Sequence, residues 1–156
     1  MKSSKLSIFG LLIPLLAVVL IPTVAAGSHA QDARKLEQAF QRVCSDCHEP
    51  ERIFESKRTR GDWESILEKM IEKGATGTDQ DFELVLQYLL SKSGMVNVNQ
   101  ATPQDIALVL EVTQKEADAI VAFRKQNGNF KNFEALTKVP DVDAAKLEQH
   151  KDALIF

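Results

Sequence analysis

Apolar residues recur at helical spacing along most of the chain after residue 30, which predicts an all-α protein. A first helix is predicted over residues 32–43, where Leu36, Phe40 and Val43 form one apolar stripe. A second helix is predicted from Asp62, as its N-cap, to Gly74. A capping-box pattern at residues 78–81 then predicts a third helix that runs to about residue 90.

The remainder of the chain predicts a second group of shorter helices. Thr102 is the expected N-cap of a helix to residue 110, with Pro103 at its first position and Asp105 closing a capping box. Further helices are expected from Thr113 to about residue 126, over residues 132–136, and from Asp143 to about residue 154. A short polar break at residues 91–94 divides two domains, over residues 31–94 and 95–156.

The first 30 residues have the pattern of a secretory signal peptide. Lys2 and Lys5 precede an apolar run over residues 8–20, and small residues follow, with cleavage expected after Ala26 or Ala30. The run is shorter than the roughly 20 apolar residues of a bilayer span, although an uncleaved membrane anchor is the alternative. The sequence therefore predicts a periplasmic protein, attached to the membrane only if this leader is retained.

Charge and composition narrow the range of partners. The formal net charge is −3, and removal of the leader, which has two lysines and no acid, takes it to about −5. An acidic surface argues against a nucleic-acid partner, whose phosphates favour cationic faces. The chain also has no cluster of catalytic type, so we expect no enzyme activity.

The residues Cys44-Ser45-Asp46-Cys47-His48 carry the main candidate chemistry. They read Cys-x-x-Cys-His, the attachment pattern of a c-type haem, and they contain both cysteines of the chain. In that pattern the two thiols bond covalently to one porphyrin, and His48 is a ligand of the iron. The sequence thus predicts one covalent haem c; a thioredoxin-like thiol pair, a zinc site and a structural disulfide are the alternatives.

Around this motif the first half resembles the small class I-type cytochromes c, and also haem-binding segments of quinohaemoprotein amine dehydrogenases. The second likeness lies in Arg58-Thr59-Arg60, Trp63, Met70 and Tyr88-Leu89. The resemblance implies electron transfer by a six-coordinate iron. Met70, two helical turns after Trp63 on the same face, is the expected sixth ligand, with Met95, His150 or an open position as alternatives. In a local basic cluster, Arg58 and Arg60 are the expected partners of the haem propionates.

The second half resembles the tandem helix-hairpin-helix module of competence-type DNA-uptake receptors. The matching residues include Val96-Asn97-Val98-Asn99-Gln100-Ala101, Phe123-Arg124, Asn127-Gly128-Asn129-Phe130 and Val139-Pro140. The hairpins of the DNA-binding members carry glycines, whereas here they read Glu111-Val112-Thr113 and Asp141-Val142-Asp143. From Val96 onward, the chain has seven basic and nine acidic residues. DNA is therefore an unlikely partner, and a protein-docking module is expected.

Together these patterns predict a periplasmic monohaem c-type cytochrome. It would carry single electrons between redox proteins and would dock to them through its second half. An exported helix-hairpin-helix DNA-binding protein is the first alternative, and a Cys-x-x-Cys thiol oxidoreductase is the second.

Overall fold

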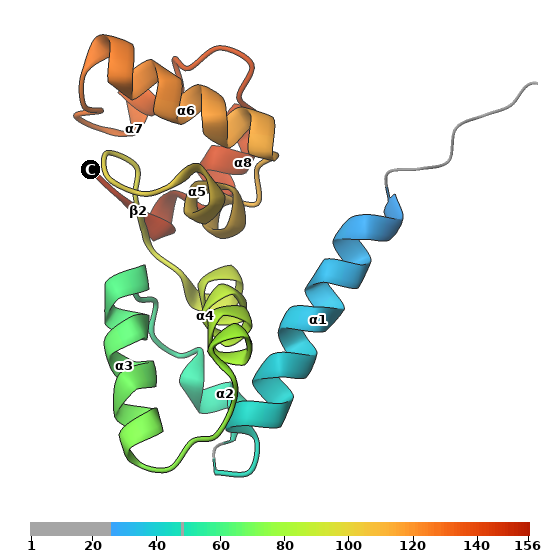
Figure 1. The fold of residues 1–156 in the computed structure, drawn as a ribbon. Coiled ribbons are helices and arrows are strands. Elements are labelled where there is room, and N and C mark those ends of the chain that lie inside the picture. Colours follow the sequence, from blue (N-terminus) through green and yellow to red (C-terminus); the bar gives the residue numbers. More distant parts are fainter. Residues whose placement is uncertain (1–25, 48) are drawn as a thin grey trace, which may run out of the picture.

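The computed structural model describes residues 26–47 and 49–156. This part of the chain is mostly helical (Figure 1). Its elements are, in order, α1 (Ala26–Cys44), α2 (Pro50–Ile53), α3 (Arg60–Glu72), α4 (Asp79–Ser93), β1 (Val96–Asn97), α5 (Pro103–Leu110), α6 (Gln114–Asn127), α7 (Phe133–Leu136), α8 (Ala144–Gln149), the 3-10 turn Lys151–Ala153 and β2 (Leu154–Ile155). None of the helices within these two ranges is long and apolar enough to cross a membrane. The expected signal peptide lies outside the described residues, apart from 26–30, which begin α1.

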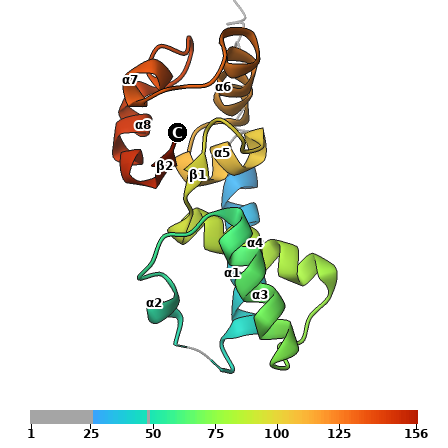
Figure 2. The same ribbon diagram turned by 90° about the vertical axis from the view of Figure 1, so that its left-hand side faces the viewer.

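In the first half α1 packs along α4, and α3 lies on the other side of α4 (Figures 1 and 2). Phe40 of α1 is buried at this contact, with its ring centroid 4.9 Å from that of Tyr88 and 5.5 Å from that of Phe54. Of the predicted apolar stripe, Phe40 and Val43 therefore face the core, whereas Leu36 lines a surface groove. The helix α2 was not predicted, because four residues are too few to show a period.

Capping explains where α3 and α4 begin. Thr78 caps α4 and forms a capping box with Asp81, as predicted. The prediction for α3 is wrong by one turn, because Thr59 and not Asp62 is its N-cap. The Asp62 carboxylate instead accepts from the Thr59 backbone N–H at 3.1 Å, as the third residue of the helix does in a capping box.

In the second half α5 packs against α6, and the shorter helices α7 and α8 follow (Figure 2). The last helix ends at Gln149, so the prediction of a helix to residue 154 is wrong. The chain turns there through residues 151–153 and adds β2 in parallel to β1, with Val96 opposite Leu154 and Asn97 opposite Ile155. This small strand pair, which an all-α prediction does not contain, ties the end of the chain to the start of the second half.

The two halves are in direct contact where α4 ends. The Arg58 N–H donates to the Ser93 carbonyl at 2.9 Å, and the Met95 N–H donates to the Arg58 carbonyl at 2.7 Å. The Trp63 indole N–H donates to the same Ser93 carbonyl at 3.3 Å. Gly94 is required at this junction, because a Cβ there would lie 2.7 Å from the Val109 side chain and would overlap the Leu90 carbonyl.

A charged pair spans the same contact. The Arg60 guanidinium donates to both oxygens of Asp105, at 2.8 to 3.1 Å, and Asp105 is almost completely buried at the start of α5. Thr102 caps α5 as predicted, but Asp105 does not close the box, because its carboxylate is turned to Arg60. The buried apolar residues of both halves form one continuous cluster. The predicted domain boundary at residue 94 thus lies within a packed interface and stays a prediction.

Candidate functional site

The first hairpin joins α5 to α6. Leu110 ends α5, Glu111 takes a left-handed conformation with φ of 51°, and Thr113 is the N-cap of α6. Left-handed residues commonly end helices and are usually glycine, because other side chains are strained there. The fold therefore keeps a glycine-type turn at a position where the sequence has a carboxylate.

The second hairpin repeats this geometry between α7 and α8. Asp141 is the second non-glycine residue with positive φ in the described chain, at 60°, and Asp143 caps α8. Asp141 and Glu111 are both two residues before an N-cap. The two hairpins of the tandem module that the resemblance implies thus share one backbone geometry.

One side chain joins the two hairpins. Glu116, in the first turn of α6, accepts with one oxygen from the Thr113 backbone N–H at 2.7 Å. With the other oxygen it accepts from the Asp143 backbone N–H at 2.9 Å. A hydrogen bond from the Thr113 hydroxyl is the largest cause that lowers the pKa of Glu116 to about 2, and the hydrogen bonds from the two backbone N–H groups are the next largest causes. The helix start at Thr113 was predicted, but the contact of Glu116 with Asp143 was not, because it joins residues 27 apart.

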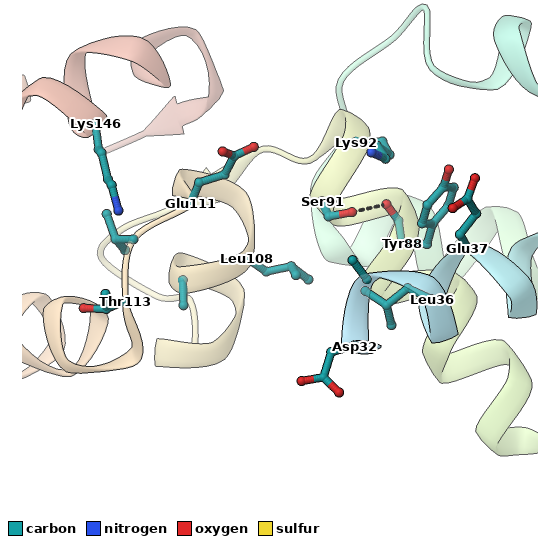
Figure 3. A pocket seen from close by; sticks show the side chains of 13 residues that line it. Asp32, Leu36, Glu37, Tyr88, Ser91, Lys92, Leu108, Glu111, Thr113 and Lys146 are labelled. Atoms are coloured by element: carbon teal, nitrogen blue, oxygen red, sulfur yellow. Dashed lines mark hydrogen bonds between the residues drawn. The ribbon is translucent and has the colours of Figure 1, made fainter. Parts of the chain in front are cut away.

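Lysines and carboxylates share the surface near the hairpins. Lys115 is exposed in the first turn of α6, and Lys146 of α8 lies close enough to Glu116 to help lower its pKa. A groove of about 650 Å³ runs from the first hairpin to α1. Figure 3 shows Lys146 and Thr113 on one side of it and Asp32 and Glu37 of α1 on the other.

Several residues that carry the helix-hairpin-helix resemblance have structural roles. The Arg124 guanidinium donates to the backbone carbonyls of Val98 and Ala101, and its burial lowers its pKa. The Asn99 side chain exchanges two hydrogen bonds with the Phe130 backbone, at 2.7 and 2.9 Å. Arg124 therefore holds the loop before α5 in place and is not a free cation for an external anion.

A second cavity lies in the first half, between α1, α3 and α4. Its volume is about 210 Å³, and Cys44, Arg58, Trp63 and Met70 are among its lining residues. Four of the residues assigned to a haem thus meet at one place, and the Arg58 guanidinium lies over the Trp63 ring, 5.6 Å from its centroid. The cavity is smaller than the roughly 300–1,000 Å³ typical of ligand pockets.

The other residues predicted to bind haem lie away from this cavity or outside the residues that the structure describes. His48 is outside the described residues. Cys47 is exposed and lines a different, open pocket, while Arg60 pairs with Asp105. Cys44 is partly buried, and this burial raises the pKa of its thiol to about 11. Among the described residues no three His, Cys, Asp or Glu side chains are grouped as a metal site.

The alternative iron ligands also lie away from the small cavity. Met95 follows the junction glycine, and His150 is half-buried with its Nε2 4.0 Å from a Glu111 oxygen. A covalent haem on Cys44, Cys47 and His48 is tested by none of these observations and stays a prediction. The mass of the exported protein tests it, because attachment adds the mass of haem, whereas free or mutually bonded thiols would contradict it.

Comparison with known proteins identifies the second half. Residues 91–155 match the family model described as the helix-hairpin-helix motif. An uncharacterized protein of Haemophilus influenzae is 40% identical over 65 residues, which are 41% of this chain and 58% of that protein. ComE operon protein 1 of Bacillus subtilis is 33% identical over 63 residues, which are 40% of this chain and 31% of that protein.

A further match covers a smaller share of a longer protein. Endonuclease/exonuclease/phosphatase family domain-containing protein 1 of Danio rerio is 41% identical over 54 residues, which are 35% of this chain and 10% of that protein. No solved structure matches the chain. In each of the three relatives the match spans less than two thirds of the protein.

These findings confirm the helix-hairpin-helix module and correct the functional prediction. The interpretation as a monohaem c-type cytochrome that carries electrons between redox proteins is wrong, because the matches fall in a helix-hairpin-helix module and include ComE operon protein 1. The same findings conflict with the expectation that DNA is an unlikely partner. They do not support a cytochrome-like first domain or redox partners.

Proposed function

We propose that this chain binds duplex DNA through its helix-hairpin-helix module and is not an enzyme. The match of residues 91–155 to the helix-hairpin-helix family carries the proposal. The resemblance to competence-type DNA-uptake receptors and the likeness to ComE operon protein 1 agree with it. Hairpins of DNA-binding members grip phosphate through exposed backbone N–H groups at a helix N-terminus, and this module has two hairpins, which a hydrogen bond of Glu116 joins.

The charges of the module suggest how strong this binding is. Lys115 and Lys146 lie at the hairpins and form no ion pair within the part of the chain that the structure describes. Glu111, Asp141 and Asp143 lie at the same hairpins and repel phosphate. We therefore expect weak, sequence-independent binding in the range of about 10⁻⁴ to 10⁻⁶ M, with a strong dependence on salt.

Fluorescence anisotropy with a labelled duplex and the full chain tests this proposal. Binding should be measurable at about 50 mM salt and should fall steeply by about 200 mM. The Lys115→Ala and Lys146→Ala variants should each bind less tightly and with a shallower salt dependence. Lys125→Ala is the matched control, because it removes an exposed lysine from the far end of α6. Failure of the full chain to bind at the lowest salt would refute the proposal.

A further inference from the structure

The carboxylate of Glu116 contacts both helix-hairpin-helix motifs. We propose that Glu116 is a positioning residue that fixes the two hairpins relative to each other, so that both meet one DNA backbone as a unit. The role in DNA binding rests on the function proposed above, whereas the link between the hairpins does not. The two can therefore be tested separately.

The capping pattern shows why α8 needs a residue from another helix. In α6 the third helical residue is Glu116, which reaches back to the backbone N–H of the N-cap Thr113. In α8 the equivalent residue is Lys146, which has no acceptor to offer to the N–H of its N-cap, Asp143. The second oxygen of Glu116 accepts from that N–H at 2.9 Å. One side chain thus completes the capping of both helices.

The ionised form of Glu116 suits this role. A carboxylate has two oxygens that accept only, so it can bind the two hairpins at the same time without an internal donor opposing either contact. The bond to Thr113 is 2.7 Å long, within the range of strong charge-assisted hydrogen bonds. The depressed pKa of Glu116, about 2, means that the link is complete at neutral pH.

The neighbouring Asp118 provides a matched control. It lies two residues further along α6, is exposed, and accepts a hydrogen bond from Gln114 of the same helix. Asp118→Ala and Glu116→Ala therefore remove the same charge from the same helix. Only Glu116→Ala removes the link between the hairpins.

Hydrogen exchange at single amides tests the link without DNA. In Glu116→Ala the Asp143 amide should exchange about tenfold faster, because its acceptor is gone. The Ala145 amide, which donates to the Asp143 side chain at 2.9 Å, should keep its protection. Equal protection of Asp143 in Glu116→Ala and the wild type would overturn the proposal. Loss of protection at both amides would also overturn it, since Glu116 would then stabilise α8 as a whole.

DNA binding tests the consequence. Removing a carboxylate should by charge alone strengthen binding, and Asp118→Ala should do so slightly or leave it unchanged. Glu116→Ala should instead weaken binding by about tenfold and reduce the salt slope, because two hairpins that no longer act as a unit lose effective concentration. If Glu116→Ala strengthens binding as Asp118→Ala does, the positioning role is refuted. If the wild type fails to bind, the proposed function fails, and the exchange result still decides whether the link exists.

Discussion

Two residues, one in each hairpin, adopt the left-handed backbone conformation that glycine usually occupies. Glu111 and Asp141 occupy the left-handed region, with φ of 51° and 60°. Asp tolerates this region better than most residues because its short side chain bonds locally, whereas Glu has no such compensation. The sequence shows that glycine is absent from both hairpins, but it does not show that the turn geometry is kept. Strain is therefore expected at Glu111 above all.

The strain at Glu111 leads to a prediction about stability. Glu111→Gly should raise the free energy of unfolding by up to about 1 kcal/mol, because glycine adopts positive φ without steric cost. It should also strengthen DNA binding, since it removes a carboxylate from the first hairpin. Thermal unfolding followed by circular dichroism measures the first effect, and anisotropy measures the second.

The same substitution elsewhere provides the control. Glu68→Gly, at an exposed position inside α3, should lower stability by about 1 kcal/mol, because glycine is unfavourable in a regular helix. If Glu111→Gly destabilises the protein as much as Glu68→Gly does, the left-handed turn is not strained.

At the scale of elements, helix starts were predictable where the capping signal is local. Thr78, Thr102 and Thr113 each precede a residue whose backbone N–H their side chain caps, and all three were predicted. Asp62 was misread because an aspartate can act as the N-cap or as the third residue of a capping box, and only the backbone shows which. The early end of α8 could not be predicted, since it follows from pairing with a strand almost sixty residues away.

The capping box of α4 predicts a pH effect. The Thr78 hydroxyl, then Arg42, hold the pKa of Asp81 at about 2, below its ordinary value of 3.8. Because the folded-state pKa is depressed, this stabilisation is complete above pH 3.8 and is lost as the pH falls toward 2. The melting temperatures of wild type and Asp81→Asn should therefore differ at neutral pH and converge near pH 2. Asp79→Asn, which changes the same charge in the same turn, should show a smaller difference throughout.

The junction between α4 and β1 predicts a steric effect. Gly94→Ala should destabilise the protein by about 1–3 kcal/mol, because the new methyl group would overlap the Leu90 carbonyl and press on Val109. Gly61→Ala is the control, since nothing lies within 4 Å of a Cβ there and alanine favours a helix. Chemical denaturation of both variants should give shifts of opposite sign, and a neutral Gly94→Ala would show that the junction can relax.

For the whole molecule, the sequence indicated two groups of helices but not how they join. The joining contacts connect residues far apart: the Met95 N–H donates to the Arg58 carbonyl, Arg60 binds Asp105, and Lys57 binds Asp152. Such pairs leave no periodic or local signal, and Asp105 was assigned to a capping box on the basis of its local sequence alone. The candidate site shows the same limit, since its hairpins were predictable and the Glu116 link between them was not.

The partly buried ion pair between the halves predicts that they unfold together. Arg60→Met should cost about 2–4 kcal/mol, because it leaves the Asp105 carboxylate, 8% exposed, without its cation. A double-mutant cycle with Asp105→Asn should give a coupling energy of about 1–3 kcal/mol. Lys57 and Asp152 also bridge the halves but are 41% and 72% exposed, so their cycle should give less than about 1 kcal/mol.

In denaturant, the fluorescence of Trp63 in the first half and the far-ultraviolet circular dichroism of the whole chain should change at the same midpoint. Separate midpoints, or equal coupling energies for the two pairs, would show that the interface does not bind the halves into one cooperative unit.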